Sequence, residues 1–426
     1  MTQLSEPIRA DVPPDEPVDV GRGGPAPSTV PTAGPAVLRE LVRDAARLPY
    51  FAEKYRDVPL VDEFDFAGVP EMTREDVTAS AAQVLRAGRR RGPAFLFTSG
   101  GSTADPKLAW IPCAMHLPEL LAHWQPLSAR DVLANLAMPG RLWSAHYCYN
   151  RVAEHAGAGV IGLGNIGDDE LGRWLDFLHA NGTTALAGVP SQLLKILRYA
   201  GERRHPILSR LRAGIWFGEP CEPELLELRD RYAPDFGLWG NYGSTETWVI
   251  GHNGPGCPVD TFHPLPYQHV ELVDGAVLVT TLHPQAVSPV IRYRIGDRAA
   301  FVACPCGAPG RALRLAGREG NLIKFAGTLV SPTDLVAVAR GVAGVGAAQI
   351  AVIAGVGTET MEVRVVPAPG AAPDPTEIRD RVLGSQVDLD FGLRGEDETF
   401  RVRLVERLTS SPQTAKTPAL VRETAP

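Results

Sequence analysis

The chain has little excess charge of either sign and no long hydrophobic run. Its 426 residues carry 42 Lys and Arg against 49 Asp and Glu, a net charge of -7, and the only basic cluster is the short "RAGRRRG" of Arg86–Gly92. This balance lacks the electrostatic footprint of a nucleic-acid-binding protein. Nor is there a secretory pattern at the start or an apolar run long enough to span a bilayer. We therefore expect a cytoplasmic protein with neither nucleic acid nor membrane as a partner.

Cysteine is also scarce, with six residues, and in the cytosol they are not expected to form disulfides. Four zinc-binding side chains nevertheless form a pattern, because "CPVDTFH" supplies Cys257 and His263 and "CPC" supplies Cys304 and Cys306. A Cys₃His set is a closed structural zinc site with no open position for catalysis. The alternative is that these are ordinary buried or surface cysteines.

Residues 1–36 are rich in Pro, Gly, Asp and Glu and poor in aromatics. Such a segment buries too little apolar surface to offset the entropy cost of ordering, so we expect a disordered tail. From Ala158 to Glu219 strand-like and helix-like segments alternate. This alternation predicts an α/β fold built on a parallel sheet.

Past Gly251 the pattern changes to short β-like pieces separated by turns, which predicts a barrel-like or antiparallel subdomain over about 251–317. At Arg318 a new α+β unit is expected to start, with helices at Pro332–Arg340 and Pro375–Val387. The predicted organisation is thus a large domain, 37–317, followed by a small mobile domain, 318–426.

The segment "FLFTSGGSTADPK", Phe95–Lys107, concentrates glycines and hydroxyls in one turn. Its free N–H groups and hydroxyls suit a phosphate, although an ordinary solvated loop has the same composition. A second glycine motif, "GLGNIG" at Gly162–Gly167, is followed by no acidic residue at the end of the next strand. We therefore expect a turn between a strand and a helix there, and not a dinucleotide site.

The segment "LWGNYGSTETW" places Tyr242 to Glu246 just beyond an apolar strand, where ligand crevices form in parallel sheets. A carboxylate tolerates a neighbouring triphosphate only with a cation between them, so Glu246 is a candidate Mg²⁺ ligand. The alternative is a capped turn at a strand end. Asp297, after the tight turn in "VIRYRIGD", is placed to accept ribose hydroxyls.

These pieces occur together and in order: "TSGGSTADPK", "GEP" at Gly218–Pro220, "NYGSTE", "PVIRYRIGD", "GREGNLIKFAG" and a terminal "AK". In this order the chain, from about Leu38 to its end, resembles the adenylate-forming superfamily of acyl-CoA synthetases. It is most similar to the phenylacetate-CoA ligase-like branch.

The resemblance implies a role for each matching residue. Thr245 would meet the α-phosphate of ATP, Glu246 the Mg²⁺, and Lys416 would be the mobile catalytic lysine. Asp297 would bind the ribose with help from Arg318. The β- and γ-phosphates would lie against Ser99, Gly100, Gly101, Ser102, Thr103 and Lys107; the remaining ATP site, including the adenine, would be framed by Gly218, Glu219, Pro220, Asn241, Tyr242, Gly243, Ser244 and Lys324.

The chain departs from the family pattern at the hinge and near the lysine. Gly320 and Asn321 replace the usual paired acids, Ala415 replaces the glycine before Lys416, and the following arginine is displaced to Arg422. The phosphate loop reads Thr-Ala where Thr-Gly is usual. These departures leave adenylation intact as an expectation and bear mainly on hinge motion and on CoA as acceptor.

Aromatic residues near the motifs suggest a pocket for a flat acid, although each is also a common core residue. His146 either pairs with the substrate carboxylate or is a satisfied interior histidine. The candidate pocket residues are Trp143, His146, Tyr147, Trp216, Phe217 and Trp239.

The implied reaction is ATP- and Mg²⁺-dependent conversion of a small, aromatic carboxylic acid to an acyl-adenylate with release of pyrophosphate. The acyl group would then pass to a thiol, in the first place CoA. A carrier-protein thiol, an amine or another small nucleophile remains an alternative acceptor, and a catalytically lapsed nucleotide-binding protein is the alternative of another class. The oligomeric state is left open, with a homodimer among the options.

Overall fold

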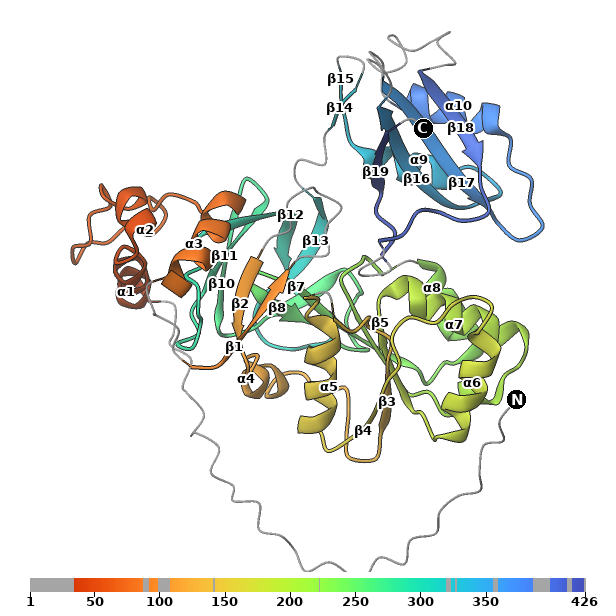
Figure 1. Cartoon of the computed structure of the whole chain (residues 1–426), viewed down its shortest axis with the longest axis horizontal. Helices are drawn as coiled ribbons and strands as arrows, with labels where there is room; N and C mark the ends of the chain where they lie inside the picture. Colours follow the sequence, from red (N-terminus) through yellow and green to blue (C-terminus); the bar gives the residue numbers. More distant parts are fainter. Residues whose placement is uncertain are drawn as a thin grey trace, which may run out of the picture.

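The structure is a computed structural model of the chain (Figure 1). It describes residues 34–86, 92–98, 108–140, 142–221, 223–318, 323–325, 328–354, 359–385, 399–411 and 416–424. The tail predicted to be disordered lies, up to residue 33, outside the described residues. Within the described ranges no helix is long and apolar enough to cross a membrane, and the cytoplasmic location stays a prediction.

An 11-stranded sheet forms the centre of the larger part, in the order β10-β11-β12-β13-β9-β8-β7-β6-β5-β3-β4. Its parallel half confirms the predicted α/β fold. The parallel strands are β3 (Val132–Asn135), β4 (Gly159–Gly162), β5 (Ala185–Gly188), β6 (Ala213–Phe217) and β7 (Gly237–Ser244). All residues of β5 and β6 are buried, as expected for strands covered on both faces.

Helices cover the two faces of this half separately (Figure 1). On one face α6 (Leu171–Ala180), α7 (Pro190–Glu202) and α8 (Pro223–Tyr232) pack in a cluster with the strand residues Leu186, Trp216 and Leu238. On the other face α4 (Leu117–Leu121) and α5 (Ala145–His155) pack against Ile215 and Phe217. The short 3₁₀ helix η1 (Pro206–Ser209) follows α7.

The β-rich region continues the same sheet as antiparallel strands, which confirms the antiparallel form of the prediction and not the barrel-like one. Its strands are β8 (Trp248–His252), β9 (Thr261–Pro264), β10 (Gln268–Val273), β11 (Ala276–Thr281), β12 (Tyr293–Val302) and β13 (Ala312–Arg318). A hairpin of β1 (Ala94–Thr98) and β2 (Leu108–Pro112) lies beside the sheet. The N-terminal helices are α1 (Pro35–Ala45), α2 (Pro49–Lys54) and α3 (Arg74–Arg86).

The C-terminal part has its own core and a 4-stranded sheet in the order β18-β17-β16-β19. Its elements are β14 (Ile323–Phe325), β15 (Thr328–Val330), α9 (Pro332–Arg340), β16 (Val345–Ala354), β17 (Glu359–Pro367), α10 (Pro375–Gly384), β18 (Phe400–Leu404) and β19 (Leu420–Thr424). Helix α9 has the bounds predicted from the sequence. Helix α10 starts where predicted and ends at Gly384, three positions before the predicted Val387, which lies outside the described residues.

Candidate active site

The turn between β7 and β8 carries Glu246 and is held from several sides. Ser244 Oγ accepts from the Thr247 backbone N–H at 3.2 Å, and the Gln268 side-chain amide donates to Thr247 O at 2.7 Å. Gly243 is required here, because an added Cβ would lie 2.2 Å from the carbonyl oxygen of Trp248. The turn therefore fixes the position of Glu246 and of its neighbour Thr245.

Glu246 is an acid in a largely closed environment, with only 5% of its surface exposed. The hydroxyl of Tyr293, which begins β12, donates to Glu246 Oε1 at 2.7 Å. Burial and the nearby Glu246 charge raise the pKa of Tyr293, so the phenol keeps its proton and acts as donor. Sequence reasoning missed Tyr293, although it lies inside the "RYRIGD" segment that drew attention to Asp297.

Asp297 on β12 is held by the two residues expected to share its ligand. The Tyr242 hydroxyl donates to Asp297 Oδ2 at 2.9 Å, and Arg318 Nε lies 3.1 Å from Asp297 Oδ1. Tyr242 comes from β7 and Arg318 from β13, where it is the register partner of Asp297. Burial, followed by the Asp297 charge, raises the pKa of Tyr242, which keeps it a donor.

The loop after β6 meets a lysine from the C-terminal part of the chain. Gly218 has a φ of +76°, and an added Cβ there would lie 2.5 Å from Lys416 Nζ. Burial lowers the pKa of Lys416, while the charge of Glu219 opposes that shift and Arg318 adds to it. Only glycine has both the backbone freedom and the missing side chain that this contact requires.

Glu219 joins that lysine loop to the large sheet. Its Oε1 accepts from the Thr417 backbone N–H at 3.3 Å, and its Oε2 accepts from the Ser191 N–H, in the first turn of α7, at 3.2 Å. Burial raises the pKa of Glu219, and the Ser191 hydrogen bond and the Lys416 charge act against it. In the structure both carboxylate oxygens of Glu219 accept from backbone N–H groups. The placement of Glu219 beside adenine stays a prediction. Pro220 is exposed.

These groups share one edge of the sheet. Glu219 follows β6 and Glu246 follows β7, at the carboxyl ends of two neighbouring parallel strands, where α/β proteins bind ligands. Asp297 and Lys416 reach this region from β12 and from the C-terminal part. An acid, a polar Tyr-Asp-Arg set and a partly buried lysine are therefore brought together from distant segments.

Two sets of predicted ATP contacts are not described. Ser99, Gly100, Gly101, Ser102, Thr103 and Lys107 lie outside the described residues, in the connection between β1 and β2. Lys324 is in β14, and its side chain is likewise not described. Asn241 is described and accepts from the Tyr149 hydroxyl at 3.1 Å through its side-chain oxygen.

The predicted acid-pocket residues do not all face one space. Phe217 stacks on Tyr149 with ring centroids 4.3 Å apart and lies 6.1 Å from Trp143. Trp216 packs on the opposite face of the sheet, against Phe262, because successive strand residues point to opposite sides. This geometry separates Trp216 from the other candidates.

The remaining candidates have other neighbours. His146 is half-buried, and its Nδ1 lies 2.8 Å from the carbonyl oxygen of Ala137. Tyr147 is 41% exposed and lies against Phe95 and Phe97. Trp239 is on the Phe217 face of the sheet, beside Gly254.

The four predicted zinc ligands converge. One ligand atom from each of Cys257, His263, Cys304 and Cys306 lies within 4.8 Å of the others. His263 Nε2 is 3.2 Å from Cys306 Sγ and 3.6 Å from Cys257 Sγ. None of the six cysteines, all of which lie within the described residues, forms a disulfide. Cys257 lies in the turn before β9 and His263 on β9, while Cys304 and Cys306 lie in the turn between β12 and β13, so the cluster joins two segments that are distant in sequence.

Three features together define an adenylate-forming type of α/β fold: the parallel sheet, the acids at its carboxyl edge, and the lysine that the C-terminal part supplies from the segment before β19. The chain belongs to the AMP-binding enzyme family, whose model matches residues 37–280. That match covers the half of the molecule in which Glu219 and Glu246 lie.

Solved structures of this fold are similar over most of the chain. A 2-hydroxyisobutyryl-CoA ligase, in a postadenylation state, has a TM-score of 0.63 at 15% identity, covering 91% of this chain and 88% of its own. ATP-bound MatB from Rhodopseudomonas palustris has a TM-score of 0.53 at 18% identity, with 76% and 66% covered. The amide bond synthetase McbA from Marinactinospora thermotolerans has a TM-score of 0.51 at 20% identity, covering 75% of this chain and 66% of its own.

A curated relative is indoleacetate–lysine synthetase of Pseudomonas savastanoi, 22% identical over 170 residues. The match spans 40% of this chain and 42% of that protein, less than half of either. At these identities the likenesses show the fold.

Proposed function

We propose that the protein activates a carboxylic acid with ATP to form an acyl-adenylate and pyrophosphate, and then transfers the acyl group to a nucleophile. The observation that carries this proposal is the position of Lys416, which lies against Gly218 at the edge of the sheet that also presents Glu219 and Glu246. A partly buried lysine at the carboxyl edge of a parallel sheet suits charge stabilisation at a phosphoryl group.

The remaining assignments are proposed from the family resemblance of the motifs. Asp297, already held by Tyr242 and Arg318, is oriented to accept ribose hydroxyls, and Thr245 precedes Glu246 at the α-phosphate. The loop between β1 and β2, with Ser99, Gly100, Gly101, Ser102, Thr103 and Lys107, is proposed to hold the β- and γ-phosphates; Gly218, Glu219 and Pro220 are proposed to border the adenine.

Mg²⁺ fits the donor present at the turn. Glu246 offers a hard carboxylate oxygen in a closed environment, the ligand type that Mg²⁺ prefers together with waters and phosphates. Glu246 would hold the ion, which when bound supplies positive charge against the phosphate oxygens.

The reaction that we propose needs no nucleophile from the protein. A substrate carboxylate oxygen bonds to the α-phosphorus, the bond from that phosphorus to the bridging oxygen breaks, and pyrophosphate leaves. Lys416 stabilises the charge that develops on the α-phosphoryl oxygens. The unit from Arg318 onward is proposed to rotate afterwards and withdraw Lys416. The acceptor then bonds to the acyl carbon, the bond from that carbon to the AMP oxygen breaks, and AMP leaves.

For the acid we propose an aromatic substrate, as in the phenylacetate-CoA ligase-like branch. The rings of Trp143, Tyr149 and Phe217, grouped between α5 and β6, support a flat substrate. CoA is the first proposed acceptor, since one structural neighbour, solved in several states, is named as a CoA ligase. An amine is the second, favoured by the names of the amide bond synthetase and of indoleacetate–lysine synthetase.

The proposal is tested by pyrophosphate release across a panel of aromatic, fatty and amino acids, followed by mass spectrometry of products with CoA, with amines or with neither. Release that depends on both ATP and one class of acid supports it. Folded protein that binds ATP and releases no pyrophosphate with any acid would support a lapsed nucleotide-binding protein instead.

We also propose one structural zinc ion per chain at Cys257, His263, Cys304 and Cys306, because their ligand atoms already converge. Structural zinc is worth about 10–16 kcal/mol of apparent binding energy in small peptides. Cys304→Ser should therefore remove most of the zinc and lower the melting temperature by several degrees or more. Metal analysis and thermal melts measure both effects.

The matched control is Cys113→Ser, since Cys113 is a free cysteine outside the cluster. It should keep the zinc content and the melting temperature of the wild type. Protein purified without chelator that holds no zinc would disprove the site.

A further inference from the structure

We propose that Tyr293 is a positioning residue that holds Glu246 as a one-oxygen metal ligand and so makes the site select Mg²⁺ over Ca²⁺. This inference rests on the proposed function, in which Glu246 binds the metal that accompanies ATP. The carrying observation is the contact itself. The Tyr293 hydroxyl lies 2.7 Å from Glu246 Oε1, and the two side chains are 1% and 5% exposed.

A hydrogen bond from a phenol to one carboxylate oxygen restricts how the carboxylate approaches a cation. Chelation by both oxygens of Glu246 would make Oε1 serve the cation and the phenol at once, which weakens the bond to Tyr293. Mg²⁺ takes six ligands in near-ideal octahedral geometry and accepts single carboxylate oxygens, whereas Ca²⁺ takes six to eight and commonly binds both oxygens of a carboxylate. Anchoring Oε1 therefore favours the smaller ion.

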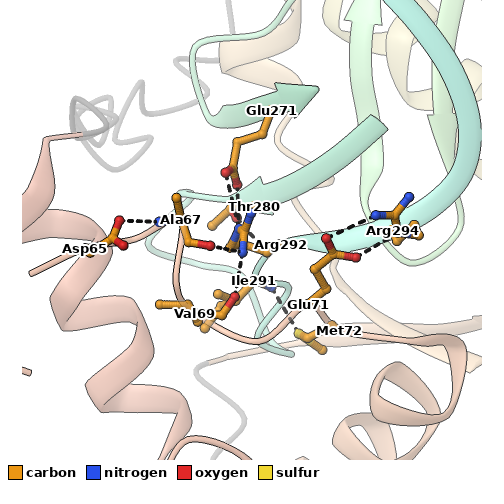
Figure 2. A network of polar contacts seen from close by, with 10 residues as sticks. All are labelled: Asp65, Ala67, Val69, Glu71, Met72, Glu271, Thr280, Ile291, Arg292 and Arg294. Atoms are coloured by element: carbon orange, nitrogen blue, oxygen red, sulfur yellow. Dashed lines mark hydrogen bonds and ion pairs between the residues drawn. The ribbon is translucent and has the colours of Figure 1, made fainter. Parts of the chain in front are cut away.

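Backbone hydrogen bonds hold the chain on both sides of Tyr293. The Met72 N–H donates to Arg292 O at 3.1 Å, and the Arg294 N–H donates to Met72 O at 3.2 Å. The Arg294 guanidinium also forms a paired contact with Glu71, at 2.7 and 3.1 Å (Figure 2). The chain before α3 thus fixes the start of β12.

Arg292 adds a second anchor beside Tyr293. It is 5% exposed, and its Nη1 donates to the carbonyl oxygens of Ala67 and Val69, each at 2.6 Å (Figure 2). Its Nε lies 3.1 and 3.2 Å from the two carboxylate oxygens of Glu271. With both flanking residues held, the phenol has little freedom to follow a moving carboxylate, which is what positioning of a ligand requires.

The test is Tyr293→Phe, which removes one hydroxyl from a buried ring. The matched control is Tyr267→Phe: Tyr267 is fully buried, and its hydroxyl has no hydrogen-bond partner among the described residues. ATP affinity is measured by calorimetry at a series of Mg²⁺ or Ca²⁺ concentrations and without divalent ions. Mn²⁺ affinity in the presence of a non-hydrolysable ATP analogue is measured by electron paramagnetic resonance, and thermal melts report on folding.

We expect Tyr293→Phe to weaken Mg²⁺- and Mn²⁺-dependent binding by about 10- to 100-fold, the usual effect of losing an outer partner of a metal ligand. The preference for Mg²⁺ over Ca²⁺ should shrink, while ATP binding without divalent ions stays within about twofold. Tyr267→Phe should change none of these. Rescue of Tyr293→Phe by higher Mg²⁺ concentration would support the same conclusion.

An unchanged Mg²⁺ to Ca²⁺ preference in Tyr293→Phe would overturn the inference while leaving the proposed function in place. An equal loss of metal-free ATP binding, or a large fall in melting temperature, would assign Tyr293 a purely structural role. Wild-type protein whose ATP binding ignores divalent ions would overturn the role of Glu246 in the proposed function, and the inference with it.

Discussion

Lys416→Ala is expected to slow acid-dependent pyrophosphate release by about a hundred- to a thousandfold, the usual cost of losing one preorganised charge donor at a reacting centre. The residue is placed for this effect, because its Nζ lies against Gly218 and close to the Glu219 carboxylate. Transfer from a supplied acyl-adenylate should remain nearly unchanged, since the lysine is proposed to leave before that step. Both rates are measured by rapid quench and mass spectrometry.

Lys195→Ala is the matched control for this variant. Lys195 lies on α7 and donates to the carbonyl oxygen of Ile166, outside the proposed ATP site. It should adenylate at the normal rate. If Lys416→Ala also adenylated normally, the proposed role of the lysine and the rotation of the C-terminal unit would both have to be abandoned.

Glu246→Gln is expected to lower ATP-dependent turnover at fixed Mg²⁺ by about a hundredfold or more. Losing only an outer partner of a metal ligand already costs about 10- to 100-fold in metal affinity or activity, and loss of the ligand itself should cost more. Glutamine keeps the size of the side chain and an oxygen that can accept from Tyr293, so the fold should be preserved. The loss should appear as a higher Mg²⁺ requirement. Turnover is measured as pyrophosphate release over a range of Mg²⁺ concentrations.

The control here is Glu154→Gln, because Glu154 is a surface residue of α5 whose carboxylate pairs with Arg151. Its Mg²⁺ dependence should match that of the wild type. A Glu246→Gln enzyme with wild-type Mg²⁺ dependence would exclude this carboxylate as the ligand.

Local sequence patterns predicted much of the secondary structure. The run "AGIWF" reads as a buried parallel strand and forms β6 with every residue buried. A helix was predicted to start at Pro332, and α9 starts there, with the Ser331 side chain accepting from the Asp334 N–H. Such signals lie within a few residues of one another, so the sequence contains them completely.

Contacts between distant segments were predicted where residue chemistry marked them and missed where it did not. His263 and Cys306 lie 43 residues apart, yet cysteine and histidine are recognisable as metal ligands at any separation. The contacts of Glu219 with Thr417, 198 residues away, and of Glu246 with Tyr293, 47 residues away, involve residue types that are common in every role. Only the packing of the strands brings them together.

The sequence also did not show which face of the sheet each strand residue points to. Trp216 and Phe217 are adjacent and both aromatic, so composition treats them alike, but alternation sends Trp216 into the core beside Phe262 and Phe217 toward Tyr149. Deciding between them requires knowing which face carries the site. That information depends on the helices packed on each side of the sheet.

The central claim is that a substrate carboxylate attacks the α-phosphorus of ATP, and it is tested most directly with an acid labelled with ¹⁸O in both carboxylate oxygens. After turnover with an acceptor, mass spectrometry of the nucleotide should find one ¹⁸O in each AMP formed and none in pyrophosphate. Production of ADP, with the label in inorganic phosphate, would mean that the acid attacks the γ-phosphorus and would contradict the account.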